Sequence, residues 1–148
     1  MKLPTFNALR SNYKGEAFEP ADIYKLIGGK VEQNFNNNKD AYFNTCALRL
    51  SYAFNYSGVV IPFHKDETGS GSDSRWYFYR VKDIIRFINN NFPFSRKLTS
   101  KNKTDFFNHC GIIYFKANWR DSSGHITLWD GNKVMHGDYF LQSQETTL

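Results

Sequence analysis

The chain has 148 residues, the length of one ordinary domain, with 41% hydrophobic and 18% aromatic residues. This composition is sufficient for a hydrophobic core. It excludes the class of small disulfide-stapled domains, because the two cysteines, Cys46 and Cys110, are too few for such a framework. The formal net charge of +5 favours an anionic partner, such as nucleic acid, a membrane surface or an acidic polymer, without choosing among them.

The N-terminal residues are not expected to form a secretory signal, since Leu3 and Pro4 are followed by Thr5, Phe6 and Asn7 with no continuous apolar stretch. No segment approaches the length of a membrane span, so we expect no membrane insertion. We therefore expect a protein made in the cytoplasm, whose action outside would need an export route without a signal peptide. With no repeat or linker visible, residues 1–148 are expected to form a single domain.

The N-terminal third predicts one short helix between irregular segments. Residues 1–18 are expected to form an irregular arm. Pro20 is suited to the first turn of a helix that continues through Ile27, where a pair of glycines ends it. Residues 33–40 are rich in Asn and are expected to form turns.

A second helix is predicted to begin at Cys46. Asn44 or Thr45 can cap it, apolar residues follow at helical spacing as far as Phe54, and Gly58 can close it. Cys46 therefore lies in the first turn of this helix.

The middle of the chain predicts a third helix between two loops. The apolar residues of the segment 81–88 fall on one helical face. Residues 64–74 and residues 95–105 are polar and are expected to be exposed loops.

The C-terminal part predicts strands. Residues 111–116 form an apolar run typical of a buried strand, and residues 124–129 alternate. Asp130 and Gly131 are a strong turn signal before a further strand over residues 133–139. Helices followed by an antiparallel sheet predict an α+β fold, with the N-terminal helices packed on a small sheet.

Cys46 is the first candidate for catalysis. A thiol in the first turn of a helix faces unpaired backbone N–H groups and the positive end of the helix dipole, and both favour the thiolate. The backbone N–H of Cys46 can also help to hold an oxyanion. A lone cysteine followed by Ala and Leu is more often a small core residue, so the hypothesis needs a partner base.

His125 is the candidate base. It follows Gly124, where a small residue lets a substrate approach, and it shares a strand face with Thr127 and Trp129. Alone, such a histidine is more often structural. A helix-start cysteine followed much later by a strand histidine is, however, the chain order of papain-like hydrolases.

A third group must orient the imidazole, and two residues qualify. If the hairpin turn lies at the Asp-Gly pair, His125 faces His136; if it lies one residue later, His125 faces Asp138. Asp-Gly is the better turn and favours His136, whereas a carboxylate would orient the ring more strongly. Both alternatives stay open.

The remaining polar residues give weaker signals. Arg49 lies three residues after Cys46 on nearly the same helical side, where it either binds a substrate carboxylate or makes a structural ion pair. His64 and His109 have no spacing typical of a metal site, so no metal is expected.

Three segments, in order, resemble the fourth family of type VI secretion amidase effectors. The stretch Asn44 to Ala53 (NTCALRLSYA) is similar to that family's nucleophile helix. Residues 111–115, followed by Trp119, resemble its central strand, and residues 124–131 (GHITLWDG) resemble its histidine hairpin. Shorter similarities lie at residues 4–7 and 27–30.

The resemblance implies an NlpC-like, papain-related fold that hydrolyses, without a cofactor, the γ-D-glutamyl–meso-diaminopimelate bond of peptidoglycan stem peptides. It also implies delivery by type VI secretion into the periplasm of a competing bacterium. A cognate periplasmic immunity protein that occludes the active-site groove is the partner that such a family implies.

The same resemblance implies roles for individual residues. Cys46 matches the family's nucleophile and His125 its general base. The family's third residue is commonly an Asp, whose position here is His136 without a gap, while Asp138 needs a small shift. The family's extra cysteine pair in this hairpin is replaced by Val134 and Asp138.

Two other functions are compatible with the residues. One is a different papain-like cysteine protease or an acyltransferase on the same scaffold. The other is a module that binds nucleic acid or glycan, which the basic charge and the aromatic residues suggest. No nucleic-acid motif is present, so a nucleic-acid partner is not expected.

Overall fold

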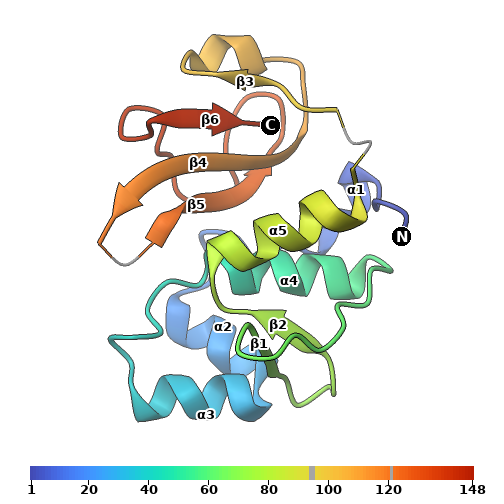
Figure 1. Ribbon diagram of the computed structural model, residues 1–148, viewed down its shortest axis with the longest axis vertical. Coiled ribbons are helices and arrows are strands. Elements are labelled where there is room, and N and C mark those ends of the chain that lie inside the picture. The colour runs from blue at the N-terminus through green and yellow to red at the C-terminus, as the bar shows by residue number, and fades with distance from the viewer. Residues whose placement is uncertain (94–95, 121) are drawn as a thin grey trace.

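A central helix, α4 (Cys46–Tyr56), lies between the two halves of the structure (Figure 1). On one side are α5 (Val81–Asn91) and a four-stranded antiparallel sheet; on the other are α2, α3 and a small two-stranded sheet. The computed structural model describes residues 1–93, 96–120 and 122–148. The expected combination of helices and antiparallel sheet is confirmed.

The side chains of α4 contribute to two hydrophobic clusters. Leu50 and Phe54 pack with Ile126 and Leu128 of the large sheet, whereas Leu48 packs among residues of α2 and α3. Burial on both sides holds α4 firmly, because each apolar side chain removed from water contributes on the order of 1.5–3 kcal/mol. The residue that opens this helix therefore has a rigid support.

The prediction of an irregular arm over residues 1–18 is wrong for residues 6–12. Residues Phe6–Asn12 form helix α1, which begins where the Thr5 hydroxyl accepts a hydrogen bond from Ala8 N–H at 3.2 Å. Leu9 and Tyr13, four residues apart, are buried against α4 and the sheet. The arm therefore belongs to the core.

The predicted helix α2 (Pro20–Ile27) is confirmed, and a second helix, α3 (Gly29–Asn37), follows it at once. The prediction of turns over residues 33–40 is therefore wrong for the part that α3 covers. The ring of Phe35 stacks on that of Tyr24 with the centroids 4.2 Å apart. This contact with α2 outweighs the weak helix propensity of the Asn-rich sequence.

The predicted loop over residues 64–74 contains a strand. β1 (Thr68–Ser70) pairs antiparallel with β2 (Trp76–Phe78). The third predicted helix is confirmed as α5, which runs three residues past the apolar pattern. Within the residues that the structure describes, no helix is both long and apolar enough to cross a membrane.

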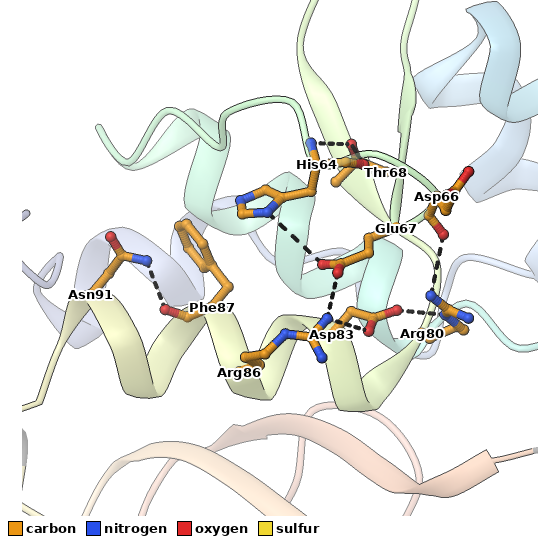
Figure 2. Close-up of polar contacts among 9 residues, drawn as sticks. All are labelled: His64, Asp66, Glu67, Thr68, Arg80, Asp83, Arg86, Phe87 and Asn91. Atoms are coloured by element: carbon orange, nitrogen blue, oxygen red, sulfur yellow. Dashed lines mark hydrogen bonds and ion pairs between the residues drawn. The ribbon is translucent and has the colours of Figure 1, made fainter.

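A network of ion pairs ties the chain before β1 to α5 (Figure 2). The Glu67 carboxylate lies 3.9 Å from His64 Nδ1 and accepts a hydrogen bond from Arg86. The buried carboxylate of Asp83 pairs with both Arg80 and Arg86. Asp83 lies in the first turn of α5, where a negative charge also complements the helix dipole.

The strands predicted over residues 111–116 and 124–129 are confirmed and are longer than expected. β4 (Gly111–Trp119) pairs antiparallel with β5 (Ser122–Trp129), and Phe115 lies opposite His125. The strand order is β3-β6-β4-β5, so β5 is an edge strand of the sheet. β5 also contacts α4.

The other two strands complete the sheet beyond β4. β6 (Glu145–Thr147) pairs with β4, and β3 (Thr99–Ser100) pairs with β6. The predicted loop over residues 95–105 is therefore wrong at β3 and also at the 3₁₀ helix Lys103–Phe106. Its residue 95 lies outside the described residues.

The prediction of a further strand over residues 133–139 is wrong. Pairing with the edge of β5 consists, in the described part of the chain, of a bridge between Trp129 and Val134 and a hydrogen bond from Met135 N–H to the Leu128 carbonyl at 2.9 Å. Beyond Met135 the chain leaves β5. This irregular segment, residues 134–140, reaches the candidate site.

Candidate active site

Cys46 begins α4 and is 1% exposed. Its backbone N–H donates to Asn44 Oδ1 at 3.1 Å, while Thr45 occupies the N-cap position without a side-chain cap bond. Of the two capping residues that the sequence offered, Asn44 therefore supplies the polar contact. The thiol lies among the N–H groups of the first turn, as the helix pattern predicts.

The thiol meets β5 along the free edge of that strand. The Leu128 carbonyl points to this edge, where it accepts a hydrogen bond from Met135 N–H. Ile126 lies two residues earlier in the strand, so its backbone N–H and C=O point to the same edge. Burial raises the pKa of the Cys46 thiol to about 11, against the lowering effect of hydrogen bonds from the backbone of Ile126 and of the first turn of α4. The expected stabilisation of the thiolate is thus present, but burial is the larger effect and the thiol is protonated at neutral pH.

His125 lies on β5 beside Ile126 and is 4% exposed. The glycine before it has a role that differs from the one expected. Gly124 has φ +145°, and a Cβ there would lie 2.1 Å from the carbonyl oxygen of Phe115. Its small size therefore permits close pairing of β4 and β5, so the strand that carries His125 needs glycine at this position.

The His125 ring is held through Nε2, which lies 2.7 Å from the backbone carbonyl oxygen of His136. Because a carbonyl oxygen only accepts, Nε2 carries a proton, and the neutral ring has Nδ1 as its basic nitrogen. Burial lowers the pKa of His125 to about 4, against the raising effect of the His136 carbonyl. His125 is therefore a neutral base at pH 7.

Among the described residues, neither candidate for the third group hydrogen-bonds to His125 through its side chain, although the His136 ring lies against that of His125 with the centroids 5.4 Å apart. His136 presents its carbonyl, while its own Nδ1 is buried without a hydrogen-bond partner among the described residues. The Asp138 carboxylate lies 2.8 Å from Lys103 Nζ. The bridge between Trp129 and Val134 places the hairpin turn one residue after the Asp-Gly pair. This is the register in which His125 would face Asp138, but strand pairing ends at Met135, before Asp138 is reached.

Arg49 is used inside the protein. Its guanidinium, 1% exposed, donates to the carbonyl oxygens of Lys14, Gly15 and Phe18, at 2.8 Å and 2.6 Å for the first two, and its Nε donates to Thr45 Oγ1 at 2.9 Å. Among the residues that the structure describes, Arg49 forms no ion pair, and its guanidinium is occupied by these carbonyl oxygens. Arg49 anchors residues 14–18, here called the 14–18 loop, to the helix that carries Cys46.

Sequence reasoning missed the part of the site that comes from the N-terminal residues. The buried Tyr13 hydroxyl lies 3.0 Å from Thr127 Oγ1 on β5, and Glu16 Oε1 accepts a hydrogen bond from Gly137 N–H at 2.8 Å. Both contacts join residues more than 100 positions apart. The spacing of Leu9 and Tyr13 after a capping Thr was the signal that could have placed this segment against the core.

Other candidate residues lie away from this site. Both cysteines are free, Cys46 buried and Cys110 exposed. A cavity of about 930 Å³ between α1, α5 and β4 is lined by Cys110, His109 and Ile126, but not by Cys46 or His125. In residues 1–93, 96–120 and 122–148, no group of three or more His, Cys, Asp and Glu side chains is placed to hold a metal ion.

Comparisons with known proteins agree with one another. Residues 42–148 match the family described as type VI secretion system (T6SS) amidase effector protein 4, Tae4. The Tae4–Tai4 effector–immunity complex from Enterobacter cloacae is similar at 32% identity and a TM-score of 0.87, over 99% of this chain and 98% of that chain. The corresponding complex from Salmonella Typhimurium is similar at 29% identity and a TM-score of 0.86, over 99% and 97%. Tae4 from Enterobacter cloacae by itself gives 31% identity and a TM-score of 0.85, over 99% and 96%. No curated protein sequence is significantly similar.

Proposed function

This chain belongs to the family of type VI secretion amidase effectors called Tae4, and we propose that it hydrolyses the γ-D-glutamyl–meso-diaminopimelate bond of peptidoglycan stem peptides. Cys46 is the nucleophile and His125 the base, on a papain-related, NlpC-like scaffold. One observation carries the proposal: the Cys46 thiol takes a hydrogen bond from the backbone of Ile126, the neighbour of His125 on β5.

Proton transfer starts from two neutral groups. Burial raises the pKa of Cys46 to about 11 and lowers the pKa of His125 to about 4, so a resting thiolate–imidazolium pair is disfavoured. His125 Nδ1 takes the thiol proton while the sulfur attacks the amide carbon. The imidazolium then protonates the leaving amine, and a thioester remains. Water, deprotonated by His125, hydrolyses the thioester and restores the thiol.

The backbone N–H of Cys46 is proposed to stabilise the oxyanion, together with the positive end of α4. In the structure this N–H donates to Asn44 Oδ1 at 3.1 Å. The oxygen of the attacked carbonyl therefore replaces Asn44 as acceptor when substrate binds. Of the two residues considered for the third role, the proposal uses His136, through its backbone carbonyl.

The surroundings of Cys46 suit a peptide that carries carboxylates. Phe43, three residues before the nucleophile, is 70% exposed and offers an apolar contact. The net charge of +5 attracts stem peptides, which carry several carboxylates. We further propose delivery by type VI secretion into the periplasm of target bacteria. The similar structures are complexes with Tai4, which supports a cognate immunity protein as the partner that covers this site.

Digestion of purified sacculi, followed by mass spectrometry of the muropeptides, tests the proposal. The wild type is expected to separate D-Glu from diaminopimelate, and Cys46→Ala to release nothing. Cys110→Ala is the matched control, because Cys110 is a free but exposed cysteine and its loss should leave the digestion unchanged. Equal release by Cys46→Ala would refute the role of Cys46. Cleavage of unrelated proteins with intact muropeptides would instead indicate another cysteine hydrolase.

A further inference from the structure

We propose that Glu16 is a positioning residue for His125 and acts through the peptide group that joins His136 to Gly137. The inference rests on the proposed function, since it concerns the same base. It assigns a carboxylate to a site in which, among the described residues, neither the His136 side chain nor the Asp138 side chain hydrogen-bonds to the imidazole.

Two hydrogen bonds at opposite ends of one peptide group carry the proposal. The carbonyl oxygen of His136 lies 2.7 Å from His125 Nε2, and the next N–H, that of Gly137, donates to Glu16 Oε1 at 2.8 Å. In a trans peptide the C=O and the N–H point in opposite directions. The carboxylate, the peptide group and the imidazole therefore form one continuous hydrogen-bonded series.

Such a series transmits charge without moving a proton. A carboxylate that accepts from the N–H polarises the peptide group, so the carbonyl oxygen becomes a stronger acceptor for Nε2–H. This effect is largest when His125 Nδ1 has taken the proton of Cys46 and the ring is positive. Glu16 thus stabilises the imidazolium, while the Nε2 proton stays on the ring.

Close packing fixes the peptide group between its two partners. Gly137 has φ +65°, and a Cβ there would lie 2.9 Å from His125 Nε2. A Cβ on Gly15 would lie 2.7 Å from the carbonyl oxygen of Met135. Both glycines therefore permit direct contact between the 14–18 loop, the segment after β5 and the ring, with no room for a side chain at either position.

The position of Glu16 is set from the helix of the nucleophile. Arg49 donates to the carbonyl oxygens of Lys14 and Gly15, directly before Glu16 in the chain. Cys46 and Arg49 both lie on α4, so one helix places the nucleophile and, through the 14–18 loop, the carboxylate. The base is consequently held from the same rigid element that carries the thiol.

The charges around the ring agree with this role. The neighbouring His136 and the Arg49 guanidinium lower the pKa of His125, whereas Glu16 raises it. The Cys46 thiol is neutral at pH 7, because burial raises its pKa to about 11. The Tyr139 ring also faces that of His125, with the centroids 4.9 Å apart. The effect of Glu16 on the pKa of His125 is therefore opposite to that of Arg49.

Three variants separate the charge of Glu16 from its hydrogen bond. Glu16→Gln keeps an acceptor for Gly137 N–H without the charge, and is expected to lower kcat about three- to tenfold with KM changed less than twofold. Glu16→Ala removes both and is expected to lower kcat about ten- to thirtyfold. Glu19→Gln makes the same charge change three residues along and should match the wild type.

Titration of the His125 ring by NMR gives a readout that does not depend on hydrolysis. In a Cys46→Ala background, Glu16→Gln is expected to lower the pKa of His125, and Glu19→Gln to leave it unchanged. If both Glu16 variants titrate like the Glu19 control and retain wild-type kcat, the inference is overturned. If Glu16→Gln lowers the pKa of His125 but neither the wild type nor any variant digests sacculi, the proposed function fails, while the effect of Glu16 on His125 stands.

Discussion

The two sides of the candidate site are built in different ways. The side of the nucleophile is a helix whose start, cap and apolar spacing follow from residues close to Cys46 in the chain. The side of the base combines β5 with residues 134–140 and the 14–18 loop, which meet through contacts between distant residues. Local signals therefore predict where the thiol lies, but not what holds the imidazole.

The difference lies in how far apart the interacting residues are in sequence. A helix is specified by spacings of three and four residues, which one segment supplies. The irregular segment after β5 takes its path from Glu16 and from Lys103, which contacts Asp138. The sequence pattern of residues 134–140 predicts neither of these contacts. Substitutions on the nucleophile side and on the base side should accordingly differ in their effects on activity and stability.

The largest effect is expected when the base itself is removed. His125→Ala should lower kcat by about 10²–10⁴-fold, the usual contribution of a general base, because the methyl group of Ala cannot accept the thiol proton. The measurement is turnover of a purified stem peptide, with the thermal unfolding midpoint as a check on folding. Retention of more than a tenth of the wild-type kcat would show that another group serves as the base.

Removing Arg49 tests the connection between the two sides. Arg49→Met leaves three partly buried carbonyl oxygens without this donor and should lower the free energy of unfolding by about 3–5 kcal/mol. Arg10→Met, on the exposed side of α1, is the matched control and should change it by less than about 0.5 kcal/mol. Urea unfolding measures both variants, and an equal, small loss in the two would mean that the 14–18 loop does not depend on Arg49.

The pH dependence tests the neutral starting state of the pair. Burial lowers the pKa of His125 from its ordinary 6.5 to about 4, so the base stays unprotonated until the pH falls near that lower value. The same shift stabilises the fold at pH values above 6.5, and this contribution is lost as the pH falls from 6.5 toward 4. We expect kcat/KM to be nearly constant from pH 7 to pH 5 and to fall by half near pH 4. A midpoint near 6.5 would indicate a solvated ring.

The sequence contains the chemistry of the site but only part of its geometry. Cys46 at a helix start and His125 after Gly124 were predicted from local patterns, and the structure brings the two elements together. The choice between His136 and Asp138 depended on extending a strand register over residues 133–139. That register ends at Met135, because backbone contacts with distant residues replace strand pairing there. The two-residue alternation of a strand sequence carries no information about where such pairing ends.

The smallest effect on activity is expected for substitution of Asp138. This variant also tests most directly what orients the base. Its carboxylate pairs with Lys103, and both side chains are exposed, so the pair contributes at most about 1 kcal/mol to stability. Asp138→Asn should therefore keep kcat within about twofold of the wild type, as follows from a base held by a carbonyl group and not by this carboxylate. Stem-peptide turnover measures the effect.

Lys103→Met is the informative companion to that variant, because it releases Asp138 from its partner without changing it. If the His136 carbonyl orients His125, both variants behave like the wild type. If Asp138 orients the ring once substrate is bound, Asp138→Asn loses more than tenfold in kcat, and Lys103→Met gains activity because the carboxylate no longer has to leave an ion pair. The two results move in opposite directions only in the second case. Together they decide whether the base is held by a side chain that its own hairpin supplies or by backbone that the N-terminal residues hold in place.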